Sequence, residues 1–321
     1  MKVVVNIPAF NEAEKIGETI KNIPRTFEGV SEVLVQVVDD GSTDGTADVA
    51  RAAGADFVIS HTTNRKLGYA FCTAVENVLD SNADIMVNID ADGQFNAQEI
   101  QKLITPILSN KADMVVGSRF GNHKVYNMPW IKLFLNRMAA AIVGRFLHVK
   151  IDDLTCGFRA HSRETLLRLN PPTGFTYTQE TIIDAIGKGL KLVWVPVTVT
   201  YFANRKSRIV SNISGFVNNS ARIIIKAVRD VRPMKFFGIP GLILLTSGAV
   251  ILFYFFILYL QDFKITPFRN VLILAITLLL IGLQFFVFAL IADMIKSSRK
   301  LTEELLYQLR KERYSSKKKD A

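Results

Sequence analysis

Two carboxylates and an amide follow an apolar run near the middle of the chain. Residues 85–89 read Ile-Met-Val-Asn-Ile, and Asp90, Asp92 and Gln94 come soon after them. A short run rich in Ile and Val predicts a buried strand, and the Asp and Gly residues behind it predict the loop that ends the strand. Because side chains alternate faces along an extended segment, Asp90 and Asp92 should point the same way. Such oxygen ligands suit Mg²⁺ or Mn²⁺, although a metal-free turn would have the same composition.

The segments around this run alternate between predicted strands and helices. Strands are predicted at 3–7, 33–38, 56–60, 86–89 and 114–116, and helices at 12–23, 47–53, 97–108 and in a segment ending near residue 79. This alternation predicts an α/β fold with a mostly parallel sheet, whose ligands bind beyond the carboxyl ends of the strands. Phe10, Asp40, Asp92 and Arg119 follow four of these strands, so we expect them to converge on one crevice. No G-x-G-x-x-G follows the first strand, which argues against a dinucleotide oxidoreductase.

A second acidic pair, Asp39 and Asp40, ends the strand predicted at 33–38. Carboxylates at this position can accept hydrogen bonds from ribose hydroxyls or from the edge of a base. The residues that follow, Ser42, Thr43 and Asp44, are also typical of a turn that caps a helix. Both interpretations are compatible, because a capped turn can still present one carboxylate to a ligand.

Basic residues dominate the region after residue 128. A helix predicted at 128–147 carries Lys132 and Arg137, and a basic loop at 204–208 contains Arg205 and Arg208. Between them lie a loop at 153–159, a helix at 179–188 and a strand at 192–201. The cations could bind a phosphate group, or they could form a solvated surface.

Two apolar segments predict a membrane hairpin. The 321 residues are 49% hydrophobic, and neither 239–260 nor 271–292 contains a charged residue. Each approaches the ~20 residues that cross a bilayer, and the alternative is a pair of buried helices in a soluble protein. Much of the formal net charge of +10 flanks this region on the side of both termini, so we predict that both termini are cytoplasmic. This distribution and the absence of a nucleic-acid-binding motif argue against a nucleic-acid partner.

The ends of the chain and its cysteines add three expectations. Residues 300–313 place four leucines on one face of a basic helix that could lie along a membrane. The N-terminus lacks the pattern of a signal peptide. Two cysteines, Cys72 and Cys156, are too few for a disulfide framework, so buried reduced thiols are predicted.

Five motifs together resemble family 2 glycosyltransferases. In order they are Pro-Ala-Phe-Asn-Glu at 8–12, Asp-Asp-Gly-Ser at 39–42, Asp-Ala-Asp-Gly-Gln at 90–94, Gly-Ser-Arg at 117–119 and Thr-Cys-Gly-Phe-Arg at 155–159. With the two apolar segments, the chain is similar to the branch that includes dolichyl-phosphate mannose synthases and related polyprenyl-phosphate glucosyltransferases. The resemblance implies a GT-A-type α/β fold followed by two transmembrane helices. Neither tryptophan lies in a Q-x-x-R-W motif, which argues against a processive polysaccharide synthase.

The resemblance also implies roles for particular residues. The nucleotide of a sugar donor would contact Pro8, Phe10, Glu12, Val38, Asp40, Asp90 and Ala91, and a metal would be bound by Asp90, Asp92 and Gln94. Arg119 would face an acceptor phosphate, with Lys132, Arg137, Arg205 and Arg208 as further cations. Lys132, Asn136 and the 204–208 loop depart from the usual pattern of the family, which often has Arg, Ser and a longer loop there.

The expected reaction is inverting transfer of a sugar from a nucleotide diphosphate sugar to a polyprenyl phosphate at the cytoplasmic membrane face. GDP-mannose, UDP-glucose and UDP-GlcNAc are all candidate donors, and dolichyl and undecaprenyl phosphate are candidate acceptors. A dianionic phosphate needs no strong base, so Asp153 and Glu180 are only reserve candidates for that role. Two alternatives are a metal-dependent nucleotidyltransferase, which would release pyrophosphate, and a non-catalytic, membrane-anchored protein that binds nucleotide sugars.

The expected organisation has four parts. They are a cytoplasmic transferase domain at 1–210, basic juxtamembrane helices at 211–236, a transmembrane hairpin at 237–295 and a basic cytoplasmic tail at 296–321. The protein would reside in the cell membrane or an ER-type membrane. The sequence leaves a homo-oligomer open.

Overall fold

The structure is a computed structural model that describes residues 1–120, 130–170, 177–200, 221–222, 225, 229–262 and 266–316. It divides into two compact units. The first comprises 1–224 together with 303–321, and the second comprises 225–302.

The first unit is built on a seven-stranded sheet with the order β3-β2-β1-β4-β6-β5-β7. The strands are β1 (Lys2–Ala9), β2 (Glu32–Asp39), β3 (Phe57–Ser60), β4 (Ile85–Asn88), β5 (Met114–Ser118), β6 (Arg159–Ser162) and β7 (Leu192–Pro196). β6 pairs antiparallel with β4 and β5, and the other pairings are parallel. The carboxyl ends of six strands therefore lie along one edge, as the α/β prediction requires.

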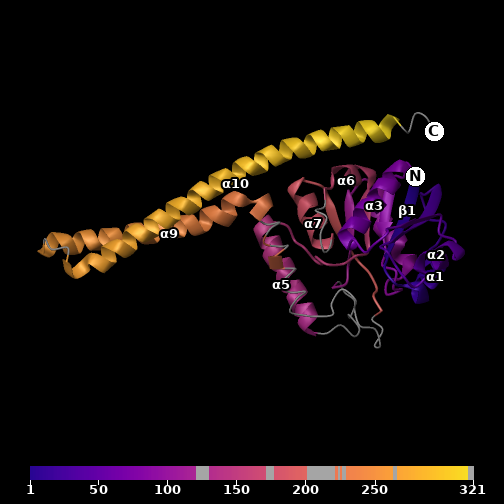
Figure 1. Cartoon of the computed structure of the whole chain (residues 1–321), viewed down its shortest axis with the longest axis horizontal. Coiled ribbons are helices and arrows are strands. Elements are labelled where there is room, and N and C mark those ends of the chain that lie inside the picture. Colours follow the sequence, from indigo (N-terminus) through magenta and orange to yellow (C-terminus); the bar gives the residue numbers. More distant parts are fainter. Residues whose placement is uncertain are drawn as a thin grey trace. The chain divides into compact units, whose positions relative to one another are not determined.

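Helices flank this sheet (Figure 1). They are α1 (Ala13–Lys21), α2 (Thr46–Ala52), α3 (Leu67–Asp80), α4 (Ile100–Leu108), α5 (Trp130–Leu147), α6 (Arg163–Arg168) and α7 (Thr178–Gly187), with a 3₁₀ turn η1 (Ala97–Glu99) before α4. The predicted fold class is confirmed. β6 and α6 are not among the predicted elements, and the loop predicted at 153–159 is wrong at its last residue, since Arg159 begins β6.

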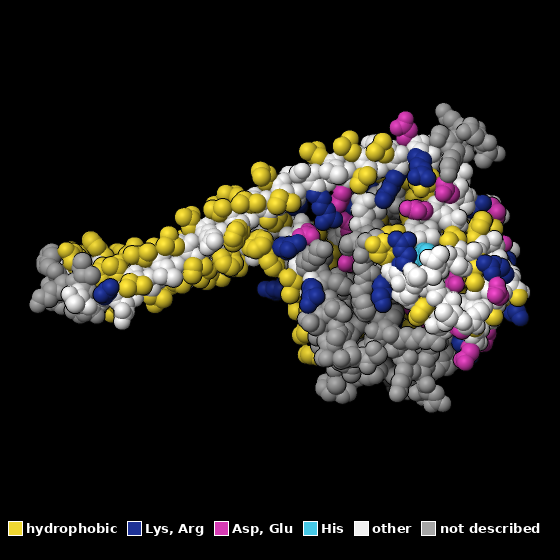
Figure 2. Space-filling view, viewed as in Figure 1, with side chains coloured by type: hydrophobic (Ala, Val, Ile, Leu, Met, Phe, Trp, Pro, Cys, Tyr) yellow, Lys and Arg dark blue, Asp and Glu magenta, His cyan; other side chains and the backbone are white. Residues whose placement is uncertain are grey.

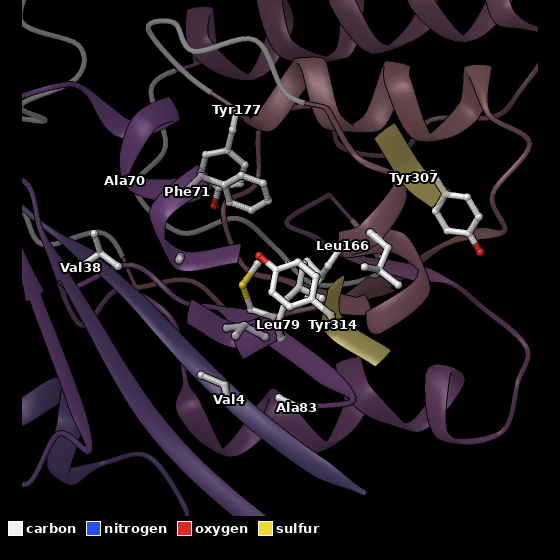
Figure 3. Packing of buried hydrophobic residues seen from close by; sticks show 14 residues of the cluster. Val4, Val38, Ala70, Phe71, Leu79, Ala83, Leu166, Tyr177, Tyr307 and Tyr314 are labelled. Atoms are coloured by element: carbon white, nitrogen blue, oxygen red, sulfur yellow. The ribbon is translucent and has the colours of Figure 1, made fainter. Parts of the chain in front are cut away.

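The core of the first unit lies where α3, α6 and Tyr177 cover one face of the sheet. Val4 and Met86 come from neighbouring strands, and Phe71 stacks on Tyr177 with ring centroids 4.2 Å apart. Figure 3 shows the two rings face to face. The central strands are buried on both faces, which is why their sequences are continuous apolar runs rather than alternating ones.

Two tyrosines of the last helix, α10 (Arg269–Ser316), belong to the same core. Tyr307 donates a hydrogen bond to Glu164 of α6 (2.9 Å), and Tyr314 is buried. Arg310 donates to the carbonyl oxygens of Leu167 and Leu169. This part of α10 therefore packs on the first unit, because its aromatic side chains find an apolar surface there.

The second unit contains two long helices, α9 (Pro233–Asp262) and most of α10, joined through the short 3₁₀ helix η2 (Thr266–Phe268). Both are long and apolar enough to cross a membrane. Apolar side chains cover this hairpin (Figure 2). The helices approach closely at Gly282, where an added Cβ would lie 2.8 Å from the backbone nitrogen of Leu245. Small residues that permit such contacts are typical of helix pairs in lipid.

Candidate functional site

Four predicted site residues lie at the carboxyl edge of the sheet. Phe10, Asp40 and Arg119 directly follow β1, β2 and β5, and Asp92 follows β4 by four residues. Because these strands run in the same direction, their loops open on the same side. The expected convergence of the four strand ends follows from this topology.

Asp40 is buried, and its carboxylate organises the loop that follows β3. It accepts hydrogen bonds from the backbone nitrogens of Arg65 (2.9 Å) and Lys66 (2.8 Å), and Nδ1 of His61 lies 2.8 Å away. Since a carboxylate accepts, Nδ1 of His61 carries a proton, and Nε2 lies 2.9 Å from the hydroxyl of Thr73. This pairing of Asp40 with His61 joins residues 21 positions apart, so no local sequence pattern signals it.

The loops after β1 and β2 are tied to each other by backbone donors. Asn11 N donates to the hydroxyl of Ser42 (2.8 Å), Thr43 N donates to Oδ1 of Asn11 (2.9 Å), and Glu12 N donates to the hydroxyl of Thr46 (2.9 Å). The helix cap of α2 is Gly45 rather than one of the residues 42–44. The polar residues of this turn therefore bind the neighbouring loop and fix the shape of the edge.

Asp90 and Asp92 lie beyond the end of β4, in a turn, and not on an extended segment as predicted. Burial and the nearby charge of Asp92 raise the pKa of Asp90 to about 7, against the opposing effect of Arg119 and Arg159. Asp92 accepts a hydrogen bond from the backbone nitrogen of Gln94 (3.0 Å). The two carboxylates therefore repel each other at a partly exposed position, and a cation would relieve that repulsion.

Two neighbouring segments hold this turn in place. The hydroxyl of Thr19 in α1 donates to the carbonyl of Ala91 (3.0 Å). On the other side, Gly157 lies so close that an added Cβ would be 2.8 Å from a carboxylate oxygen of Asp90. Any larger residue at position 157 would displace that carboxylate.

The donor set suits a hard divalent cation that shares its ligands with a substrate. Asp90 and Asp92 supply two carboxylates, and among the described residues no three or more His, Cys, Asp or Glu side chains lie close enough together to bind a metal ion. Mg²⁺ is commonly bound by one or two carboxylates together with phosphate oxygens and water, rather than by a full protein cage. The chemistry of these residues therefore fits such an ion.

Arg119 forms a buried ion pair with Asp153. Its Nε and Nη2 donate to the two carboxylate oxygens (2.7 and 2.9 Å), and Nη2 also donates to the hydroxyl of Thr155 (2.6 Å). The side chains of Arg119 and Asp153 are 9% and 0% exposed. Asn136 Nδ2 also donates to Asp153 (3.1 Å), and together these partners lower the pKa of Asp153 despite its burial. Asp153 thus holds the Arg119 guanidinium in place. Because both of its carboxylate oxygens are used in this ion pair, the geometry favours an orienting role for Asp153 over the role of a general base.

The other predicted cations are distributed unevenly. Arg119 and Arg137 lie on the ring of Phe120, with guanidinium carbons 5.4 and 5.8 Å from its centroid, so these two residues share one neighbour. Lys132 belongs to α5, but its side chain is not among those described. Arg205 and Arg208 lie outside the described residues.

The residues predicted to contact a nucleotide differ in exposure. Phe10 is 37% exposed, and Pro8 and Glu12 are partly exposed. Val38 and Ala91 are buried, and Val38 packs in the core. A ligand at this edge would therefore meet the backbone of these last two residues rather than their side chains.

Arg159 is a buried cation that the sequence analysis quoted only as part of a motif. It is 0% exposed and donates to the carbonyls of Cys156 (2.6 Å) and Thr178 (2.6 Å) and to the hydroxyl of Thr181 (2.9 Å). Burial lowers the pKa of its guanidinium group. An arginine inside an otherwise apolar motif is the signal that could have identified it.

The remaining titratable groups of interest are structural. Burial lowers the pKa of His161 to about 3 and raises the pKa of Cys156 to about 12. Both cysteines are free thiols, with Cys156 buried and Cys72 partly exposed.

The family model described as Glycosyl transferase family 2 matches residues 4–169, more than half of the chain. The chain therefore belongs to this family of glycosyltransferases, which confirms the resemblance seen in its motifs.

Among its relatives, a polyprenol monophosphomannose synthase of Mycolicibacterium smegmatis is 32% identical over 209 residues, covering 62% of this chain and 77% of that one. Glycosyltransferase AglJ of Haloferax volcanii is 28% identical over 303 residues, covering 92% of this chain and 94% of AglJ. The fold is similar to glucosyl-3-phosphoglycerate synthase from Mycobacterium tuberculosis in complex with Mn²⁺ and UDP, with a TM-score of 0.56 over 71% of this chain and 80% of that one. At 22% identity, that likeness shows a common GT-A-type fold alone.

Proposed function

We propose that this glycosyltransferase transfers a sugar from a nucleotide diphosphate sugar to a polyprenyl phosphate, with inversion at the anomeric carbon. The observation that carries this proposal is the pair of carboxylates, Asp90 and Asp92, on the same sheet edge as Arg119. An acidic pair suits the cation of a donor diphosphate, and a fixed arginine suits a phosphate. The names of two relatives, the polyprenol monophosphomannose synthase and a dolichol-phosphate mannosyltransferase of Pyrococcus furiosus, support this acceptor class.

Each side of the edge would bind one substrate. Asp40 and the tied loops after β1 and β2 would hold the nucleotide, with Phe10 and Glu12 at the rim. Asp90 and Asp92, with Gln94, would hold Mg²⁺ or Mn²⁺ together with the diphosphate. When bound, a divalent cation supplies the positive charge that stabilises the departing diphosphate.

The acceptor side would work by positioning. An acceptor phosphomonoester has a second pKa near ~6, so its oxygen is already nucleophilic at neutral pH. Arg119, held by Asp153, would orient that phosphate opposite the leaving group. The phosphate oxygen forms a new bond to the anomeric carbon while the bond from that carbon to the nucleoside diphosphate breaks. No side chain has to remove a proton.

An exposed apolar stripe on α5 supports a lipid acceptor. Phe134, Met138 and Ile142 are spaced by four residues and are 59%, 44% and 56% exposed. Residues at this spacing share one helix face, and a face of this kind suits acyl or isoprenoid chains. Arg137 lies on the same helix and would place a cation beside the lipid phosphate.

The two apolar helices support membrane attachment. We propose that the transferase domain and both termini are cytoplasmic, because basic residues flank the hairpin on those sides. In this scheme residues 1–210 form the transferase, 211–236 the juxtamembrane helices, 237–295 the transmembrane hairpin and 296–321 the cytoplasmic C-terminal segment. An acceptor whose tail stays in the bilayer requires such an anchored enzyme.

The test uses the full chain in detergent with Mn²⁺, undecaprenyl or dolichyl phosphate, and in turn radiolabelled GDP-mannose, UDP-glucose and UDP-GlcNAc. Label should enter the lipid extract with one of these donors, with release of a nucleoside diphosphate. Asp92→Ala should abolish this transfer and leave the unfolding curve unchanged. Release of pyrophosphate would identify a nucleotidyltransferase, and donor binding without turnover would identify a non-catalytic protein. NMR of the product's anomeric proton tests inversion.

A further inference from the structure

Three buried amide side chains form a row across the middle of the sheet. Asn6 of β1 is paired in register with Gln36 of β2 and with Asn88 of β4, so the three residues are neighbours on adjacent strands. All three are almost completely buried. Each directly follows an apolar run of its strand, and burying an amide is unfavourable unless it is hydrogen-bonded.

These amides belong to a hydrogen-bond chain in which every donor points the same way. Asn77 of α3 donates to Gln36 (2.6 Å), Gln36 donates to Asn6 (3.0 Å), and Asn6 donates to Asn88 (2.8 Å). Asn88 then donates to the hydroxyl of Tyr177. Hydrogen bonds arranged head to tail polarise one another, so such a chain is stiffer than its separate members.

The chain ends beside Asp90. The hydroxyl of Tyr177 donates to the carbonyl of Gly157 (3.4 Å), and Gly157 is the residue that lies against the Asp90 carboxylate. Asn88 is two residues before Asp90 in sequence. The hydrogen-bond chain therefore reaches Asp90 by two routes. One is the backbone that joins Asn88 to Asp90, and the other is the contact of Tyr177 with Gly157, which lies against the Asp90 carboxylate.

The ring of Tyr177 is fixed independently of its hydroxyl. It stacks on Phe71 with an interplanar angle of 9°, and Figure 3 shows both rings within the apolar cluster. Removing the hydroxyl would therefore leave the ring in place and interrupt only the hydrogen-bond chain.

We propose that Tyr177 is a positioning residue of the cation site, and that the amide chain from Asn77 to Asn88 fixes its hydroxyl so that Gly157 holds the Asp90 carboxylate in its binding orientation. This inference rests on the proposed function, since it assumes that Asp90 binds the cation. Partners of this outer kind commonly change metal affinity by ~10-fold or more.

The test measures Mn²⁺ binding by EPR on the full chain in detergent, with UDP and GDP present in separate titrations. Tyr177→Phe should raise the Kd for Mn²⁺ by about tenfold. In the transfer assay it should raise the Mn²⁺ concentration needed for half-maximal rate, while the rate at saturating Mn²⁺ stays close to that of the unmodified chain. An unchanged Kd, or a lower saturating rate with an unchanged Kd, would overturn the proposal.

A matched control is available in Tyr307→Phe. This variant also removes the hydroxyl of a buried, hydrogen-bonded tyrosine, but on α10. Its Mn²⁺ Kd should not change, and an equal rise in both variants would show a general loss of stability instead. If Tyr177→Phe does not fold, Asn77→Ala takes its place, because it removes the first donor of the hydrogen-bond chain at a partly exposed position. This variant should raise the Kd for Mn²⁺ about twofold. An unchanged Kd in Asn77→Ala would also overturn the proposal.

Asp92→Ala separates this inference from the proposed function. Loss of Mn²⁺ binding in Asp92→Ala with normal binding in Tyr177→Phe would refute only the role of Tyr177. Normal Mn²⁺ binding in Asp92→Ala would refute the metal site itself.

Discussion

The two halves of the sheet edge fix their charged groups by different means. In the half formed after β1 and β2, the carboxylate of Asp40 is held by backbone N–H groups and His61. In the half formed after β5 and before β6, Arg119 and Asp153 are held by each other, and Arg159 is buried among carbonyl groups. Backbone donors stay in place when one side chain changes, whereas a buried ion pair depends on both partners. The half that contains Arg119 and Asp153 should therefore lose more stability when one of its charged residues is replaced.

The sharpest test of this difference is Asp153→Asn. The substitution leaves the Arg119 guanidinium buried without its counter-charge, and breaking a buried pair in this way costs about 3–5 kcal/mol. Urea unfolding in detergent, followed by tryptophan fluorescence, measures the loss. Transfer should fall at least as steeply, because Arg119 loses its orientation.

A double-mutant cycle with Arg119→Met checks that the loss belongs to the pair. The double variant should recover part of the stability, since no unpaired charge remains. The pair lowers the pKa of Asp153 in the folded protein. Its contribution to the free energy of unfolding is therefore complete above the pKa of Asp153 in the unfolded chain, and it is lost as the pH falls through the lower pKa of the folded protein. The stability gap between Asp153→Asn and the unmodified chain should therefore narrow in strong acid. The account would be contradicted if the two substitutions lowered the free energy of unfolding additively, and if the difference in stability between Asp153→Asn and the unmodified chain stayed constant with pH.

The corresponding change in the other half, Asp40→Asn, should cost less. The amide oxygen of the new side chain can still accept a hydrogen bond from the backbone nitrogen of Arg65 or of Lys66. The other nitrogen loses its acceptor, which should lower the free energy of unfolding by about 1–3 kcal/mol. The loop after β3 would loosen, and KM for the nucleotide sugar should rise while acceptor KM stays constant. A larger loss of stability than that of Asp153→Asn would reverse the comparison between the two halves.

Between the halves, Asp90 should make the proposed cation binding sensitive to pH. Its pKa is raised to about 7 by burial and by Asp92, with Arg119 and Arg159 opposing, so protons compete with the cation below that pH. Mn²⁺ affinity should be constant above pH 7 and should fall by at most about tenfold per pH unit below it. EPR titrations between pH 5.5 and 8.5 measure this. An affinity that stays flat to pH 5.5 would show that Asp90 does not titrate in this range.

The sequence predicted the first half of the sheet better than the second. Strands β1, β2 and β4 are apolar runs that end in Pro, Asp or Asn residues, so their existence and their common edge could be predicted. Strand β6 reads Arg-Ala-His-Ser, a pattern with no apolar alternation. Arg159 is buried because carbonyl groups, among them that of Thr178 19 positions away, accept its hydrogen bonds, and no local pattern reports the partner at that distance.

The same limit applies to the candidate site. The acidic motif at 90–94 could be identified from residue types and spacing, but the geometry of its turn could not, because β4 ends earlier than predicted. The pairing of Arg119 with Asp153 joins residues 34 positions apart, and the contact of Asp40 with His61 joins residues 21 positions apart. Candidate residues are thus visible in the sequence, whereas their partners depend on the tertiary fold.

The smallest effect is expected on the far side of the first unit, where α10 packs on α6. Tyr307→Phe removes a hydrogen bond to Glu164, whose side chain is 43% exposed, so the loss should be about 1 kcal/mol. The ring contact with Arg168, whose guanidinium carbon lies 4.2 Å from the centroid, remains. Urea unfolding should show this small shift, while transfer rate and both KM values stay unchanged. A change in acceptor KM alone would instead show that this helix helps to present the transferase to its lipid substrate, and the division of the edge into two independent halves would then be incomplete.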